Sequence, residues 1–490
     1  MAITPGDSLN LTPSPKQSTL SSNYIDFIDG TTGWEQQYLP DLMEKEAEVF
    51  GKRTISGFLS QVGAEEAMTA DQVVWSEQGR LHLAYQGDIV AATSKVTLDG
   101  FVGSNASWDA SNQSHGLRVG DTCIVASSTV TYVGRVSVVD GTGNNDVTIL
   151  PYIKAHAATT GIGMVDGAVT VLKYGSEWQK GSDTPYTQAN EPQFKSYSNK
   201  PVIIRDMYHI SGSDTSQVGW VEVSGEDGTS GYLWYLKAEG ETRMRFTDNL
   251  EMTCLEGVRG EVGNTIDSTA ANAGLGVTDA SPIGTQGMFD AIKDRGNQTS
   301  GISGVNAATD LAEFDAILAE FDKQGAIEEN MMFVNRATSL AMDDMLASMN
   351  SYGAGGTSYG VFNNAEDMAL NLGFTGFRRG SYDFYKTDWK YLNDAGTRGA
   401  INDRATTDAI RGVMVPAGTS SVYDEMLGRN LKRPFLHTRY RASQTDNRKF
   451  KTWITGSVGA ATSELDAMRV NYLSERCLIT QGANNFMLLT

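Results

Sequence analysis

The sequence has few of the residues from which disulfide-linked or zinc-bound proteins are built. Among its 490 residues there are three cysteines and five histidines. The cysteines, Cys123, Cys254 and Cys477, are far apart and odd in number, which argues against a disulfide framework and fits a reducing compartment during synthesis. The histidines are scattered, so ligands adjacent in the sequence do not form a zinc cluster. We therefore expect neither a metal nor another cofactor.

The sequence also lacks an apolar run approaching the roughly 20 residues that cross a bilayer. Its first residues, MAITPGDSLNLTPSPKQSTLSS, contain neither a basic nor an apolar segment, so no secretory signal is visible. We expect no membrane contact. Hydrophobic residues make up 40% and charged residues 20%, which is ordinary for a folded soluble protein. The length suffices for two or three domains.

The charge is strongly acidic but unevenly distributed. The net charge is −20, and such a chain should repel polyanions, so we do not expect sequence-specific nucleic-acid binding. Residues 1–50 carry eight acids and two lysines, whereas residues 429–451 carry eight lysines or arginines and one acid. A charge run of this kind is either a solvated face or a surface through which copies of the chain recognise one another.

Residues 86–172 have the composition of a small all-β module. Along VTYVGRVSVVDG, four apolar residues are predicted on one strand face: Val130, Tyr132, Val136 and Val138. The strands DVTILPY and AVTVLKY follow, and DGTGNND is a hairpin-type turn. We expect a compact barrel or sandwich, inserted into a larger unit. Just before it, VVWSEQGRLHLAY (73–85) predicts a strand pair that turns at Gly79.

The longest predicted helix covers residues 231–258, GYLWYLKAEGETRMRFTDNLEMTCLEGV, which contain no proline. Its charges pair at i,i+4, each pair worth only a few tenths of a kcal/mol: Glu239 with Arg243, and Glu241 with Arg245. At 1.5 Å per residue the helix would be roughly 40 Å long. Most of its stability must therefore come from packing of apolar residues such as Leu236 and Leu250.

Further helices and strands are predicted in the second half of the chain. Residues 285–350 are helical in pattern, because apolar residues recur at spacings of three and four from Leu311 to Phe321. Within them, MMFVNRA (331–337) predicts a strand and TSLAMDDMLASM a helix. Asp343 and Asp344 are adjacent on that helix, so their side chains diverge by about 100° and do not form an acid/base dyad.

One motif raises the possibility of catalysis. GTSYG (356–360) matches the G-x-S-x-G pattern of hydrolases, with Ser358 as the nucleophile. That chemistry needs an apolar strand before the serine and a histidine base after it. The preceding SMNSYGAG is polar and glycine-rich, and the later histidine, His437, lies among arginines. We interpret the motif as a loop and predict that the protein is not an enzyme.

The central sequence resembles a known family. NKPVIIRDMYHISGSDTSQVGWVEV, running into GYLWYLKAEGETRMRFTDNLEM, resembles the major capsid proteins of tailed bacteriophages with the Hong Kong 97-type fold, and is most similar to those of crAss-like phages. YDFYKTDWKY and the closing YLSERCLITQGANNFMLL are also similar. The resemblance implies an α+β fold with an N-arm, an extended E-loop, a long spine helix, a peripheral (P) domain and an axial (A) domain.

The resemblance also implies a division of the chain. Residues 1–72 would be an N-terminal extension and N-arm, and residues 73–228 an E-loop region interrupted by the all-β insertion at 86–172. The P-domain would follow at 229–285, with the spine helix at 231–258. Residues 286–430 would form the A-domain, and residues 431–490 would return to the P-domain sheet and supply a final strand.

The implied function is structural, without catalysis. Hexamers and pentamers of the chain would form an icosahedral shell around double-stranded DNA, which is held non-specifically at the inner wall. Implied partners are a portal, auxiliary or decoration proteins, and a separate scaffolding protein. The implied location is the virion capsid, assembled in the cytoplasm of a bacterial host. The alternatives are a β-rich surface or ligand-binding protein that uses residues 86–172, and a serine hydrolase that uses Ser358.

Charged residues are the candidates for contacts between subunits. A chain of net charge −20 that associates with copies of itself must offset repulsion locally. We predict that basic residues near the C-terminus meet acidic residues of adjacent subunits and do not primarily hold DNA. The acidic candidates are Glu44, Glu46 and Glu48. The basic candidates are Arg429, Lys432, Arg433, Arg439, Arg441, Arg448, Lys449 and Lys451.

Overall fold

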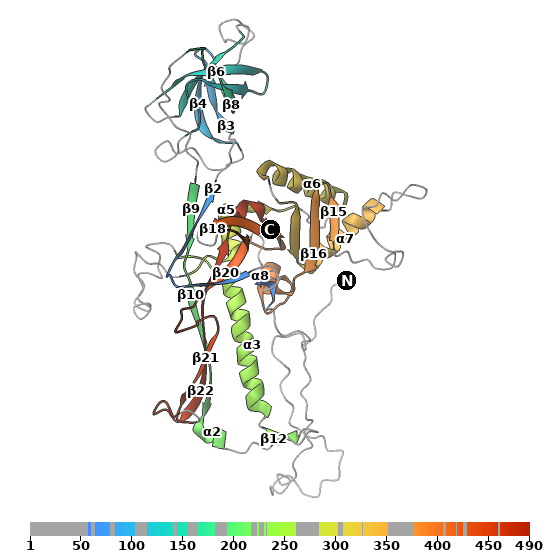
Figure 1. Ribbon diagram of the computed structural model, residues 1–490. Coiled ribbons are helices and arrows are strands. Elements are labelled where there is room, and N and C mark those ends of the chain that lie inside the picture. The colour runs from blue at the N-terminus through green and yellow to red at the C-terminus, as the bar shows by residue number, and fades with distance from the viewer. Residues whose placement is uncertain are drawn as a thin grey trace. The chain divides into compact units, whose positions relative to one another are not determined.

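The computed structural model of the chain is a mixture of helices and sheets that divides into two compact units (Figure 1). One unit is formed by residues 74–198, and the segments on either side of it form the other. The structure describes residues 57–59, 64–78, 84–102, 115–140, 145–153, 165–181, 194–216, 223–224, 230–231, 233–260, 284–301, 307–325, 327–350, 376–404, 408–417, 419–424, 429–458 and 461–490. Two predicted features, the segment 1–56 and the loop around Ser358, lie outside these ranges.

The first unit contains a closed six-stranded barrel, in the order β3-β4-β7-β6-β5-β8. Its strands are β3 (Ala84–Val90), β4 (Lys95–Phe101), β5 (Asp121–Ala126), β6 (Thr131–Val139), β7 (Asp146–Pro151) and β8 (Gly167–Ser176). Aliphatic side chains fill the interior, and Val96, Val136 and Ile149 are completely buried. The all-β module predicted at 86–172 is this barrel.

One predicted strand face is wrong at its end. Tyr132 and Val136 point into the barrel, but Val138 is 55% exposed. The register of β6 against β7 shifts between Val136 and Val138, which is a β-bulge. A bulge inserts one extra residue, so the alternation of inward and outward side chains is reversed beyond it.

The partner of the strand that begins at Val73 differs from the prediction, and the predicted turn at Gly79 lies outside the described residues. Strand β2 (Val73–Gln78) pairs with β9 (Phe194–Asn199), in a two-stranded sheet. In the sequence, the barrel strands β3 to β8 therefore lie between the two paired strands β2 and β9. The sequence pattern gave the strand itself but not its partner, which is more than a hundred residues away.

We expect residues 74–198 to fold when expressed alone, because the barrel's hydrophobic core is made of barrel residues. The fragment should give a well-dispersed amide NMR spectrum. As a control, Ile149→Asp places a charge in the core and should collapse that dispersion. A narrow amide spectrum from the unsubstituted fragment would contradict independent folding.

The second unit contains a five-stranded sheet built around one long strand. Strand β22 (Ala467–Thr480) pairs with β10 (Val202–Ser211) on one side, and with β20 (Leu436–Arg441) and β21 (Lys451–Gly456) on the other. Strand β1 (Ala64–Met68) runs parallel to β20 and completes the order β1-β20-β22-β10.

Helix α3 (Leu233–Glu256) packs against β10 and β22 of this sheet. It has 24 residues and corresponds to the helix predicted at 231–258. Phe246 and Leu250 on the helix pack with Val470 and Tyr472 on β22. The helix ends before Gly257, where a Cβ atom would lie only 2.6 Å from the carbonyl oxygen of Thr253, so a larger residue does not fit there.

A six-stranded sheet lies in the same unit, in the order β13-β23-β17-β14-β16-β15. Its strands are β13 (Asn297–Thr299), β14 (Glu329–Val334), β15 (Gly376–Arg379), β16 (Tyr382–Asp388), β17 (Gly412–Pro416) and β23 (Met487–Leu489). Its helices are α6 (Ala307–Gln324) and α7 (Arg336–Asn350), and both follow the predicted pattern, as does β14.

The predicted division at residue 430 stays a prediction, and two features of the topology bear on it. The final strand, β23, joins the six-stranded sheet between β13 and β17, not the five-stranded sheet around β22. Strands β18 (Thr419–Asp424) and β19 (Arg429–Pro434) form a hairpin, so the boundary predicted after residue 430 falls inside a strand. The shorter elements are α2 (Gly212–Ser216), β11 (Val223–Ser224), β12 (Ser230–Gly231), α5 (Met288–Arg295), η7 (Lys390–Leu392), α8 (Arg398–Arg404) and η8 (Ala483–Asn485).

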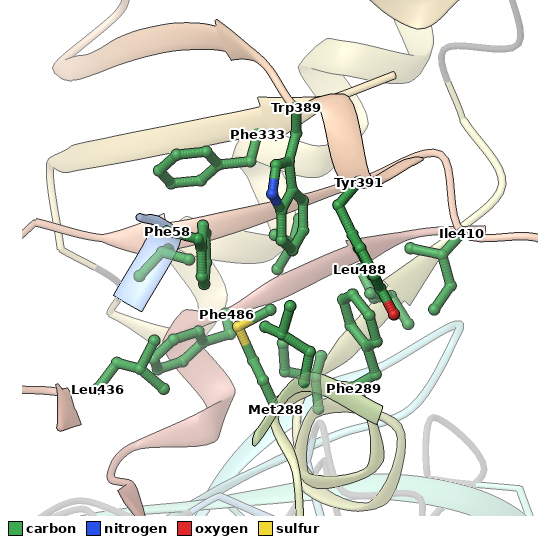
Figure 2. Close-up of a cluster of buried hydrophobic side chains, with 14 of the residues drawn as sticks. Phe58, Met288, Phe289, Phe333, Trp389, Tyr391, Ile410, Leu436, Phe486 and Leu488 are labelled. Atoms are coloured by element: carbon green, nitrogen blue, oxygen red, sulfur yellow. The ribbon is translucent and has the colours of Figure 1, made fainter. Parts of the chain in front are cut away.

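One hydrophobic cluster holds the elements of the second unit together, as Figure 2 shows. It combines Leu436 from the five-stranded sheet, Phe333 and Leu488 from the six-stranded sheet, and Met288 from α5. Phe58 enters from the N-terminal side, and its ring stacks on Trp389 with the ring centroids 4.4 Å apart. The two sheets therefore share a core.

Candidate interaction surface

The predicted basic residues lie around the junction of β1, β20 and β22, where several hold acids of their own chain. Strands β1 and β20 are in register so that Glu66 and Arg439 are paired positions. A guanidinium nitrogen of Arg439 lies 3.0 Å from a carboxylate oxygen of Glu66. Both side chains are partly buried, so this ion pair fixes the edge strand β1 onto the sheet.

Glu475, on β22, is the most buried acid of this junction. It is 6% exposed, and its two oxygens lie 2.8 Å from Nε of Arg441 and 2.6 Å from Nε of Arg448. Arg441 also forms an ion pair with the exposed Asp71. A carboxylate buried to this degree needs its cationic partners, because an uncompensated buried charge is strongly destabilising.

The two lysines of the stretch are more accessible. Lys449 pairs with Glu65 and lies over the ring of Tyr440, at 5.4 Å. Lys451 lies 2.8 Å from Asp446 and, as hydrogen-bond donor, holds the pKa of that carboxyl below its usual value. The two lysine side chains are 42% and 41% exposed. Among the predicted basic contact residues whose side chains the structure describes, these two are the most exposed.

The other predicted contact residues cannot be placed at side-chain level. Arg429, Lys432 and Arg433 lie on β19, and their side chains fall outside the described part of the structure. Glu44, Glu46 and Glu48 lie in the segment 1–56, also outside it. Their contact with adjacent subunits stays a prediction.

Charged residues of α3 are directed at the sheet. The hydroxyl of Tyr472 donates to Glu239 at 3.4 Å, and Arg243 lies over the ring of Phe450 at 5.6 Å. Arg245 forms an ion pair with Asp206, at 3.7 Å. Leu250 is buried and Glu241 is half-buried, whereas the side chain of Leu236 lies outside the described part. Glu239, Arg243 and Arg245 therefore contribute to the packing of the helix against its neighbours, and stiffening by i,i+4 pairs stays a prediction.

Sequence reasoning missed an anchor at Asn199, where β9 leads into β10. Its side-chain nitrogen donates to the carbonyl oxygens of Leu478, at 2.7 Å, and Gln286, at 2.9 Å. Its side-chain oxygen accepts the backbone N–H of Gln286 and the hydroxyl of Thr285. The amide is buried with both ends occupied, so it fixes where the chain enters the sheet.

A second anchor is Glu251, on α3. This carboxyl is 6% exposed and accepts backbone N–H groups from Gly57, at 2.8 Å, and Leu59, at 3.1 Å. Burial raises its pKa, and these backbone donors oppose that rise. The contacts hold the segment that carries Phe58 against the helix.

A third anchor, Glu256, lies at the C-terminal end of α3. It accepts the hydroxyl of Tyr391 at 2.8 Å and a guanidinium N–H of Arg398 at 2.7 Å. An acid at a helix C-terminus opposes the helix dipole. That unfavourable position is a signal in the sequence for a cationic partner elsewhere, although it does not identify Arg398.

A buried ion pair supports the six-stranded sheet. Lys386 on β16 is 7% exposed and Asp343 on α7 is 8% exposed. The amino group of Lys386 binds the carboxylate of Asp343 and the carbonyl oxygen of Ser339. Asp343 thus has a structural partner in Lys386.

The described residues contain no group of three or more histidine, cysteine or acidic side chains arranged to hold a metal. In the same ranges, no helix is both long enough and apolar enough to cross a membrane. The three cysteines are free and buried, and burial raises the pKa of Cys123 and Cys477 to about 12. These thiols therefore stay protonated at neutral pH.

No family model and no curated protein matches the chain. Among solved structures, it is similar to one from Mycobacterium phage Ogopogo, with a TM-score of 0.40 and 10% identity over 93% of this chain and 97% of that chain. The capsid structure of the cyanophage P-SCSP1u gives a TM-score of 0.38 and 8% identity over 99% and 98% of the two chains. A structure from Microbacterium phage Oxtober96 gives 0.36 and 8% over 93% and 97%. Similarities at this level do not establish a shared fold or function.

Proposed function

We propose that the chain is the major capsid protein of a tailed double-stranded DNA bacteriophage, with a Hong Kong 97-type fold. The observation that carries the proposal is α3, a 24-residue helix packed against a sheet whose central strand has 14 residues. A long helix packed on a long, narrow sheet makes the subunit rigid along that direction, and a protein shell needs rigid subunits. The resemblance of the sequence that forms β10 and α3 to capsid proteins supports the same conclusion.

On this proposal each part has a place in a shell subunit. Helix α3 is the spine helix, and the sheet around β22 belongs to the P-domain. The six-stranded sheet with α6 and α7 is the A-domain, which β23 also joins. The paired strands β2 and β9 are the base of the E-loop, and the barrel is its insertion. The subunits form hexamers and pentamers around DNA, with portal, scaffolding and auxiliary proteins as partners.

The proposal is tested by the size and shape of what the purified full-length chain forms. Size-exclusion chromatography with light scattering should find capsomers or larger shells, and negative-stain electron microscopy should show closed particles or rings. Co-expression with a scaffolding protein from the same genome provides the more permissive condition. A chain that stays monomeric under both conditions would overturn the proposal.

We expect charge reversal at Lys449 and Lys451 to block assembly while the subunit stays folded. Arg439, Arg441 and Arg448 already hold acids within the chain, so their replacement would weaken the fold as well. The two lysines are more exposed, and an exposed pair is worth only about 0–1 kcal/mol. The same contacts recur at every subunit junction, however. The combined variant Lys449→Glu/Lys451→Glu should therefore form no shells at all, not even empty ones without DNA.

The control is Lys323→Glu, at a side chain on α6 that is 72% exposed. Circular dichroism should be unchanged in both variants, and electron microscopy should show shells only in the control. Normal empty shells from the double variant that fail only to retain DNA would assign these lysines to the inner wall instead.

A further inference from the structure

The outer surface of the barrel is apolar on one side. Six side chains point outward from the adjacent strands β7, β6, β5 and β8, and we call them the barrel apolar face: Ile124, Val133, Leu150, Tyr152, Leu172 and Tyr174. Five of them are between 38% and 56% exposed, and Ile124 is partly exposed. Their chain neighbours Val125, Ile149 and Val171 are completely buried, so the interior is already filled without them.

Strand register makes this face continuous. Ile124 on β5 is paired with Val133 on β6 and with Leu172 on β8. Tyr152 donates its backbone N–H to the carbonyl oxygen of Val133, and Leu150 is paired with Arg135. The outward side chains of β3 and β4 differ, because Gln86, Asp88 and Asp99 are exposed there. The barrel is therefore apolar on one side and mainly polar on the other.

The rim of the barrel apolar face carries both signs of charge. Arg135 lies over the ring of Trp178, at 5.9 Å, and its Nε donates to the carbonyl oxygen of Glu177. The carboxylate of Glu177 accepts the hydroxyl of Tyr152. An apolar centre with a polar rim is the usual anatomy of a protein–protein contact. A two-fold axis that passes between this cation and this anion would place each of them opposite the other in the second copy.

The extent of the face also fits a contact between copies. Six side chains, each roughly half exposed, offer on the order of 500 Å² of apolar surface per barrel. A stable complex of two free proteins buries about 800 Å² on each partner. The face is therefore too small to hold free barrels together, but large enough when tethering raises the effective concentration to roughly the millimolar range. Copies held in a shell meet that condition.

We propose that the barrel apolar face binds the same face of a barrel in a neighbouring copy, which rests on the proposed shell function. The contact would link subunits through the inserted barrels, in addition to any contact made by the sheets. Its formation would depend on assembly, so dissociated subunits would leave the face exposed.

The test uses full-length chains with one added surface cysteine, because the native cysteines are buried. Leu150→Cys places a thiol on the barrel apolar face, and Asp88→Cys places one on the polar side as the control. Tyr152→Cys is a second probe should the first disturb folding.

Maleimide labelling of Leu150→Cys should be about tenfold slower in assembled particles than in dissociated subunits, because only the opened state reacts. Asp88→Cys should react equally in both. A short bismaleimide should crosslink Leu150→Cys chains into dimers in particles.

Each other outcome overturns the inference. Particles in which Leu150→Cys reacts as fast as in dissociated subunits would show that nothing covers the face, while leaving the shell function intact. Slow labelling already in dissociated subunits would mean that the chain covers its own face. Protection in particles without crosslinked dimers would assign the face to a different partner. A chain that never assembles would overturn the proposed function together with this inference.

Discussion

Replacing Lys386 by alanine is expected to lower the free energy of unfolding by about 3–5 kcal/mol, because it leaves the Asp343 carboxylate uncompensated in the interior. Both residues are buried, with 7% of Lys386 and 8% of Asp343 exposed, between α7 and the six-stranded sheet. The amino group also satisfies the carbonyl oxygen of Ser339. Guanidinium unfolding followed by circular dichroism at 222 nm measures the change, since the described helices all lie outside residues 74–198.

Two further variants separate the lost partner from the lost packing. The combined replacement Lys386→Met/Asp343→Leu removes both charges and should recover most of the stability, because a buried ion pair gains little over apolar residues of similar size. Lys293→Ala removes the partner of Asp408, whose side chain is 63% exposed, and should cost only about 0–1 kcal/mol. Equal losses of stability for Lys386→Ala and Lys293→Ala would show that burial of an acid does not make the fold more dependent on its cationic partner.

Local periodicity explains what the sequence could predict. The helix from 231 to 258, the strand within 331–337 and the all-β texture of 86–172 each depend on neighbours within a few residues. Those elements are present as α3, β14 and the barrel. The error at Val138 has a local cause as well. A single bulge residue reverses the alternation of inward and outward side chains, and the composition does not indicate the bulge.

Long-range pairing accounts for what the sequence could not predict. Strand β2 finds its partner in β9, and Lys386 finds Asp343 across 43 residues. Glu251 binds a segment 194 residues earlier in the chain. No local pattern identifies such partners, because a lysine, an aspartate or a glutamate is equally compatible with an exposed position. The unfavourable position of Glu256 at a helix end was the one local sign of a distant contact.

The basic stretch illustrates both cases at once. The predicted contact of residues 429–451 with acids of adjacent subunits stays a prediction, and the composition did not reveal that Glu475 and Glu66 of the same chain pair with three of the arginines. Lys449 and Lys451 also pair with acids of the same chain, Glu65 and Asp446, although their side chains are more exposed than those of the arginines. A charge run predicts that opposite charge will be near, whereas the fold decides whether that charge belongs to the same subunit.

Replacing Phe246 by alanine is expected to lower the free energy of unfolding by about 3–5 kcal/mol and to reduce the helical signal at 222 nm. The ring is completely buried between α3 and the sheet. It stacks on Tyr472 with the ring centroids 5.7 Å apart, and meets Phe450 edge-on at 5.3 Å. The i,i+4 charge pairs contribute only a few tenths of a kcal/mol each, so the long helix depends on this packing.

Met244→Ala is the matched control, because that side chain lies on the same helix but is 40% exposed. It truncates an apolar side chain at a solvated site and should change stability by no more than about 0.5 kcal/mol. Phe246→Leu keeps an apolar side chain at the buried site and should fall between the two. Equal losses of stability for the alanine variants at 246 and 244 would show that helix propensity, and not packing on the sheet, stabilises α3.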